Sequence, residues 1–177
     1  MASRDETAPH EVWREPVTHP VWRWVCLAAL GTVAVLGLLN VFGQKTRTVE
    51  AASTNGFGGT FTVTVPERLR SGLIYQATFD INAGEDGIAK PRLVFSHGWA
   101  DGSTLNSAMP EPGRQLSATD TGNTVWIYRS VPPGGRLKVV TSWQVDPTGP
   151  ASRELVTVLS DGDRELARYE NRLEVFP

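Results

Sequence analysis

The chain of 177 residues has few of the side chains that usually form covalent or metal-bound sites: one cysteine, Cys26, and three histidines. A single thiol cannot close an internal disulfide, and the region after the apolar run contains no cysteine-based metal site. Cys26 precedes most of that run, whereas a lipoprotein cysteine follows its apolar stretch. These observations argue against a disulfide scaffold, a zinc domain and lipidation at Cys26.

Neither sign of charge predominates in the sequence. The 17 basic and 19 acidic residues give a net charge of −2, and the region from Lys45 onward has fourteen basic against fifteen acidic residues. A nucleic-acid-binding domain usually concentrates Lys and Arg on one face or along one helix. The sequence therefore predicts that nucleic acid is not a partner.

One long uncharged run, from Trp24 to Gln44, differs from the rest of the chain. A helix of twenty-one residues is about as long as the hydrocarbon core of a bilayer is thick. A cleaved signal peptide has a shorter apolar region followed by a small-residue cleavage site, and only a weak candidate, Val49-Glu50-Ala51, follows here. We predict a transmembrane helix over residues 21–43 rather than a signal peptide or a buried core helix.

The residues flanking the run suit a membrane anchor. Trp22 and Trp24 have the side chains that favour the membrane–water interface, and Arg23 can extend to the lipid headgroups. Three arginines precede the run, and Lys45 and Arg47 follow it closely, so the charge difference across it is small. A β-rich domain after an N-terminal anchor is usually exported. We predict a single-pass protein of the cell membrane with a cytoplasmic N-terminus and an extracytoplasmic C-terminal domain.

The remaining boundaries follow from composition and periodicity. Residues 1–20 are polar, contain three prolines and show no helical period, which predicts a flexible tail. Residues 44–58 are predicted to be a linker, and residues 59–177 an exported domain.

Polar and apolar residues alternate in most of that domain, as in strands with one buried face. Asp161-Gly162 is a hairpin turn signal between the last two such segments. No segment after the apolar run has a convincing helical period. The predicted fold is all-β, an Ig-like antiparallel β-sandwich preceded by one transmembrane helix. The predicted strands are residues 60–65, 73–82, 92–96, 123–131, 137–145, 154–159 and 165–176.

Three segments resemble bacterial Ig-like repeat modules: Gly-Leu-Ile-Tyr-Gln-Ala-Thr-Phe (72–79), Pro-Arg-Leu-Val-Phe (91–95) and Val-Pro-Pro-Gly-Gly-Arg-Leu (131–137). The resemblance covers roughly residues 57–177 and is one of pattern. The plan of the chain also resembles small bacterial single-span membrane proteins with one exported sandwich. The resemblance implies a spacer or adhesive module without catalytic residues. The tandem repetition of adhesins is absent from this sequence, so an adhesin role is not predicted.

Ser96, His97 and Asp101 are the residue types of a hydrolase site, in which a base activates a nucleophile. Adjacent residues of a strand point to opposite faces, however, which would separate Ser96 from His97. The nucleophile elbow GxSxG is also absent. A loop histidine at a strand end is the simpler interpretation, and an envelope hydrolase centred on His97 stays an alternative.

The sequence predicts no metal and no other cofactor. Zinc requires several nitrogen or sulfur ligands, and the domain has one histidine, His97. Oxygen ligands for calcium could come from Asp161-Gly162-Asp163 or from Glu85-Asp86, but neither has the spacing of an EF-hand loop. Asp-Gly is first of all a turn former.

Trp99, Trp126 and Trp143 could form a platform for sugar rings if their indoles were exposed. Trp143 lies on the apolar face of its predicted strand and is assigned to the core. An exposed Trp126–Tyr128 pair would make a contact patch, and packing beneath a loop is the alternative. Trp126, Tyr128 and Trp99 are the candidate partner-binding residues.

The sequence thus predicts a non-enzymatic single-pass membrane protein whose exported sandwich binds an envelope protein as an accessory or assembly subunit. The bilayer is the second predicted partner. A cell-wall or glycan-binding module is the first alternative.

Overall fold

A computed structural model describes residues 20–38, 45–118 and 121–176, in a chain that divides into two compact units, 1–43 and 44–177. In the first unit, α1 spans Pro20–Leu38, and its residues from Val21 to Leu38 are apolar enough to cross a membrane. Such a helix suits a membrane anchor or a signal sequence alike. Except for Pro20, the predicted tail lies outside the described residues, as do residues 39–43 of the predicted span.

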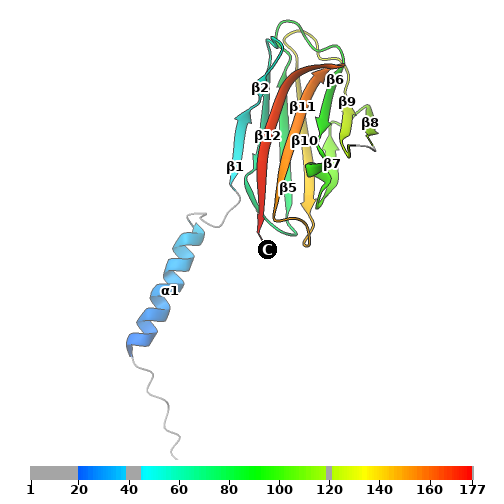
Figure 1. Cartoon of the computed structure of the whole chain (residues 1–177). Helices are drawn as coiled ribbons and strands as arrows, with labels where there is room; N and C mark the ends of the chain where they lie inside the picture. Colours follow the sequence, from blue (N-terminus) through cyan, green and yellow to red (C-terminus); the bar gives the residue numbers. More distant parts are fainter. Residues whose placement is uncertain (1–19, 39–44, 119–120, 177) are drawn as a thin grey trace, which may run out of the picture. The chain divides into compact units, whose positions relative to one another are not determined.

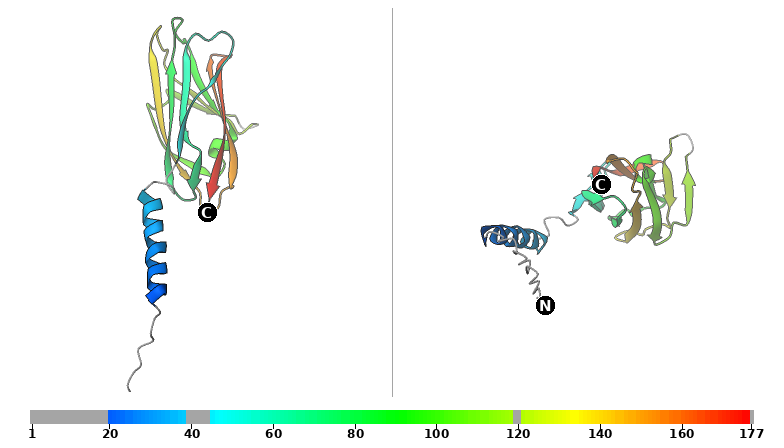
Figure 2. Two further views of the ribbon diagram at one scale, coloured as in Figure 1. Left: turned by 90° about the vertical axis from the view of Figure 1, so that its left-hand side faces the viewer. Right: turned by 90° about the horizontal axis from the view of Figure 1, so that it is seen from below.

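The second unit is a sandwich of two β-sheets (Figures 1 and 2). Its neighbouring strands are antiparallel, apart from the parallel pair β4–β12. In spatial order, sheet A contains β1 (Thr46–Glu50), β3 (Thr60–Pro66), β5 (Ile74–Asn82), β10 (Arg136–Val145) and β7 (Ser103–Met109). Sheet B contains β2 (Ala52–Ser53), β12 (Arg164–Phe176), β11 (Ser152–Asp161), β6 (Pro91–Phe95), β9 (Thr124–Ile127) and β8 (Arg114–Ser117), with β4 (Arg68–Arg70) beside β12.

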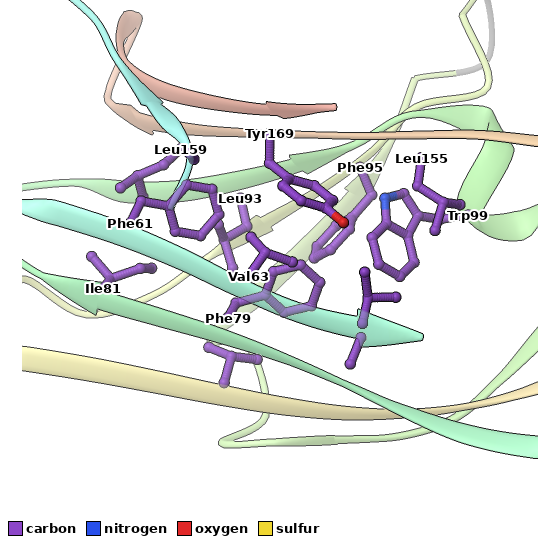
Figure 3. Close-up of a cluster of buried hydrophobic side chains, with 14 of the residues drawn as sticks. Phe61, Val63, Phe79, Ile81, Leu93, Phe95, Trp99, Leu155, Leu159 and Tyr169 are labelled. Carbon is purple, nitrogen blue, oxygen red and sulfur yellow. The ribbon is translucent and has the colours of Figure 1, made fainter. Parts of the chain in front are cut away.

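The core lies between the two sheets and is formed mainly by alternate residues of the longer strands. On β5, for example, Tyr75, Ala77, Phe79 and Ile81 are all buried. Phe79 and Phe95 in this core pack edge to face, with 5.2 Å between their ring centroids (Figure 3). The predicted fold class, an Ig-like antiparallel β-sandwich after an apolar helix, is confirmed.

The predicted linker at residues 44–58 is wrong over the segment that forms β1 and β2. β1 pairs with β3 of sheet A, and β2 pairs with β12 of sheet B, so the chain passes from one sheet to the other at Ala51. Ala51 is buried, and its amide donates a hydrogen bond to the Phe61 carbonyl oxygen at 2.7 Å. This segment is therefore part of the folded domain.

The other differences from prediction concern short elements. A helix of one turn, α2 (His97–Ala100), follows β6 where no helix was expected, and it buries Trp99. β4, β7 and β8 were also not predicted. β9 ends at Ile127, earlier than predicted, and Val131 forms an isolated bridge with Ile88.

Candidate functional site

The three aromatic residues predicted to contact a partner are buried. Trp99 and Trp126 are each 1% exposed and Tyr128 is 8% exposed. Trp126 pairs across the sheet with the inward-facing Leu93, and its ring centroid lies 4.5 Å from that of Phe95. The exposed Trp126–Tyr128 pair is therefore a wrong expectation, and Trp126 packs in the core between the sheets rather than beneath a loop. A sugar platform on Trp99 and Trp126 is excluded by the same burial.

Tyr128 borders an open groove of about 420 Å³, together with Pro110, Val131 and Leu137. Burial raises the pKa of the Tyr128 hydroxyl well above its ordinary value of 10.0. That hydroxyl has no hydrogen-bond partner among the described residues. A neutral phenol in this position suits packing, and it supplies no base or nucleophile near neutral pH.

The residues of the alternative hydrolase site do not form a catalytic arrangement. Ser96 Oγ accepts a hydrogen bond from the Val156 amide at 3.1 Å and thereby fixes α2 against β11. His97 is exposed, and within the described part of the chain no carboxylate or hydroxyl hydrogen-bonds to its imidazole. Asp101 meets His97 only through the backbone, by an amide that donates to the His97 carbonyl oxygen at 2.9 Å. The contacts of these three residues therefore belong to the α2 turn, and they do not activate a nucleophile.

Two of the acidic residues considered for calcium, Asp161 and Asp163, have structural partners. Asp161 Oδ1 accepts a hydrogen bond from the Lys90 amide at 2.6 Å, and Asp163 forms an ion pair with Arg92 at 2.9 Å. Within residues 20–38, 45–118 and 121–176, no three His, Cys, Asp or Glu side chains converge as metal ligands. The turn at Asp161-Gly162 joins β11 to β12, as its sequence indicates.

The outer face of sheet B has an apolar surface. Leu116 on β8 pairs with Val125 on β9, Val125 with Val94 on β6, and Val94 with Val158 on β11. Residues paired in this way have their side chains next to each other on one face of the sheet. Leu116 is 41% exposed and the three valines are half-buried. We call these four residues the apolar row.

The surroundings of the apolar row extend it and give it a polar border. Ile127 and Val156 lie two residues along β9 and β11, on the same face, and both are half-buried. Beyond Val158 the next strand presents Arg168, which forms ion pairs with Glu165 at 3.0 Å and Glu170 at 3.5 Å. An apolar centre with a charged border is the usual composition of a protein-binding surface.

β8 provides a free sheet edge beside the apolar row. Among the described residues it pairs with β9 alone, and all four of its own residues are exposed. The corresponding edge of sheet A, β7, has an extra residue, Asn106, because its register with β10 shifts between Ser142 and Trp143. Such a bulge protects an edge from pairing, and the β8–β9 ladder has none.

Sequence reasoning did not find this surface. One available signal was the alternation on β9, where Val125 and Ile127 on either side of Trp126 make both faces of the strand apolar. What the sequence could not supply is the register, which brings Val125 next to Val94 and Leu116.

No protein-family model matches the chain, and no curated protein matches it in sequence. Solved structures with a similar sandwich include a cohesin module from a family 33 glycoside hydrolase of Clostridium perfringens. The two are 13% identical, the match covers 67% of this chain and 97% of that chain, and the TM-score is 0.47. A cohesin of Acetivibrio cellulolyticus, solved in complex with a dockerin, has 9% identity, 62% and 94% coverage and a TM-score of 0.42. A non-cellulosomal cohesin from the archaeon Archaeoglobus fulgidus has 13% identity, 75% and 92% coverage and a TM-score of 0.40. These values do not assign the chain to the cohesins.

Proposed function

We propose that the chain is a non-enzymatic, single-pass membrane protein whose exported sandwich binds an envelope protein through the outer face of sheet B. The observation that carries this proposal is the apolar row beside the free edge of β8. The chain would act as an accessory or assembly subunit that holds its partner at the membrane.

The apolar row supports binding because the fold does not require it. The core between the sheets is closed by the inward residues, whereas the apolar row lies on the opposite face and contributes no inter-sheet contact. Single exposed apolar side chains are common on soluble domains, but contiguous patches usually mark binding surfaces. Burial of the remaining exposed apolar area would contribute about 25 cal/mol per Å² before the costs of association.

The proposed partner segment is an extended strand that adds to β8. Backbone hydrogen bonds to the outer edge of β8 would supply affinity, and alternate apolar side chains of the partner would lie over Leu116 and Val125. The exposed Arg114 at the start of β8 favours an acidic residue at the facing end of that segment.

The proposed role of α1 is to anchor the domain. Trp22 and Trp24 are 66% and 73% exposed, and Arg23 between them is exposed as well, which suits contact with the lipid interface. With the N-terminus in the cytoplasm, the sandwich would lie outside the membrane, where anchoring raises the effective concentration of partners in the same bilayer.

Site-specific photo-cross-linking of the full chain in its native membrane tests the proposal. A photoreactive residue replaces Val125 in one variant and Thr78, on the outer face of sheet A, in the matched control. We expect Val125 to capture one defined envelope protein that the control does not capture. Val94→Glu in the Val125 variant should reduce capture at least tenfold, whereas Thr62→Glu on sheet A should leave it unchanged.

Three results would contradict the proposal. They are equal capture from both faces, capture that survives Val94→Glu in a folded domain, and cross-linking of the chain to a second copy of itself alone. Extraction of the membranes with alkaline carbonate tests the anchor separately, because a protein with a cleaved α1 would be released.

A further inference from the structure

We infer that one end of the sandwich docks on the bilayer surface and prefers anionic phospholipid headgroups. This end consists of the β4–β5 turn, the last residues of β12 and the start of β1. The inference rests on the proposed anchor, and it assigns the domain itself a second contact with the membrane.

Exposed large apolar side chains concentrate at this end. Among the described residues of the sandwich, five such side chains are exposed, and three of them belong to it: Leu73 (42% exposed), Ile74 (58%) and Phe176 (48%). The other two are Met109 and Leu116. Turns between strands are usually polar, so adjacent Leu and Ile at a turn are unfavourable in water unless another surface covers them.

Backbone hydrogen bonds bring these three residues together from distant parts of the sequence. The Ser71 amide donates to the Phe176 carbonyl oxygen at 2.7 Å, and the Gly72 amide donates to the Val145 carbonyl oxygen at 3.0 Å. Gly72 has a φ of +77°, which the tight turn before Leu73 requires. The apolar side chains therefore sit on a fixed frame.

The chain also enters the sandwich at this end. The Glu67 amide donates to the Lys45 carbonyl oxygen at 2.8 Å, and the Glu174 amide donates to the Glu67 carbonyl oxygen at 3.1 Å, which ties the start of β1 to the end of β12 (Figure 1). Seven residues, 39–45, separate Leu38 of α1 from Thr46. A chain of that length extends at most about 25 Å. An anchored α1 would thus keep this end of the domain within reach of the headgroups.

The charges at this end are complementary to an anionic leaflet. Lys45 and Arg70 are exposed and form no ion pair within the described part of the chain. Arg47 and Arg68 are exposed as well, and they pair with Glu67 at 3.2 Å and Glu174 at 3.1 Å. Two unpaired cations beside exposed apolar side chains form an interfacial composition, in which the cations contact phosphate and the apolar groups enter the boundary of the acyl chains.

The test uses the full chain in vesicles of phosphatidylcholine, with or without about 30% phosphatidylglycerol, a proportion typical of a strongly anionic leaflet. A nitroxide is attached at Leu73→Cys in a Cys26→Ser background, and a matched nitroxide at Glu85→Cys, at the other end of β5. We expect the label at 73 to be accessible to oxygen and shielded from a water-soluble nickel complex in the anionic vesicles. The label at 85 should behave as an aqueous label.

Charge reversal then identifies the contact. Arg70→Glu should return the label at 73 to aqueous behaviour, whereas Lys138→Glu, an exposed site on the outer face of sheet A, should not. An aqueous label at 73 in both vesicle types, or equal immersion with and without the anionic lipid, would overturn the inference. Carbonate extraction of the same vesicles separates the two proposals: release of the protein refutes the anchor, and retention with an aqueous label refutes the docking alone.

Discussion

The two sheets share one core, but their outer faces are chemically different. The outer face of sheet A includes the cross-strand neighbours Thr48, Thr64 and Thr78, and the hydroxyl oxygens of Thr48 and Thr64 lie 2.9 Å apart. The outer face of sheet B presents the apolar row instead. Sheet A has apolar side chains on its own outer face at the start of β5, where Ile74 is exposed, and at the β7 edge, where Val140 lies beside Met109. A sandwich needs apolar residues on its inner faces alone. The outer apolar face of sheet B is therefore the basis of the proposed contact with a partner.

The largest expected loss of stability comes from a substitution on the inner face of β9, and a substitution on its outer face serves for comparison. Trp126→Ala should lower the free energy of unfolding by about 3–5 kcal/mol, because it removes an indole packed against Phe95 in the core. Val125→Ala, one residue away on the outer face, should cost less than about 1.5 kcal/mol. Denaturant unfolding monitored by circular dichroism measures both. Equal losses would mean that the outer face contributes to the fold as much as the inner face does.

A second substitution tests the segment that joins the two sheets. Ala51→Glu should cost more than about 2 kcal/mol, because it places a carboxylate without a partner in the buried crossing between β1 and β2. Ala52→Glu, at the exposed neighbouring position, is the control and should have little effect. If both variants unfold like the parent protein, residues 44–58 behave as a tether and the two sheets are joined elsewhere.

The three tyrosines test whether the inner faces are closed to water. Burial raises the pKa of Tyr75 and Tyr128 and raises the pKa of Tyr169 to about 12, from an ordinary value of 10.0. Folding thus favours the neutral phenol, and the stability that this contributes is lost as pH rises above 10.0. An alkaline titration followed by tyrosinate absorbance should show ionisation coincident with unfolding. One tyrosine titrating near its ordinary pKa in the folded protein would reveal an exposed ring.

The smallest effect concerns the polar outer face of sheet A. Arg136 Nε donates a hydrogen bond to Asp80 Oδ1 at 2.6 Å, and this contact holds the pKa of Asp80 below its ordinary value of 3.8. The stability from the pair is present above that value and is lost as pH falls through the lower pKa of the folded state. Asp80→Asn should therefore lower the melting temperature slightly at neutral pH and leave it unchanged at about pH 2. A variant with the same deficit at both pH values would show a steric cause.

The central strands could be predicted from sequence, and most edge strands could not. β5, β10, β11 and β12 have neighbours on both sides and alternate clearly between buried and exposed positions. β1, β7 and β8 have one neighbour each and bury few side chains, so the period of two is weak in Thr-Arg-Thr-Val-Glu and Arg-Gln-Leu-Ser. The mistaken linker and the missed strands have this common cause.

The candidate site was harder to predict than the fold, because it depends on pairing between distant segments. The sequence places Val94, Val125 and Val158 on strands, but only the register makes them neighbours. The prediction based on Trp126 named the correct strand, β9, but the wrong face of it, because the indole lies on the inner face. An aromatic side chain within an alternating segment is more often core than contact, as its burial here illustrates.

The ladder between β1 and β3 also determines how the domain would respond to force. β1 starts at Thr46, next to the end of β3, and its five register pairs run from Thr46–Pro66 to Glu50–Thr62. Antiparallel hydrogen bonds lie perpendicular to the strands, so a pull on Lys45 along β1 loads these pairs together, in shear. A bound partner that pulls the domain away from the proposed anchor would therefore have to break all the β1–β3 hydrogen bonds together, and it could not open them one pair at a time. The first strand of the sandwich would thus act as a mechanical clamp at the point where the chain enters the domain.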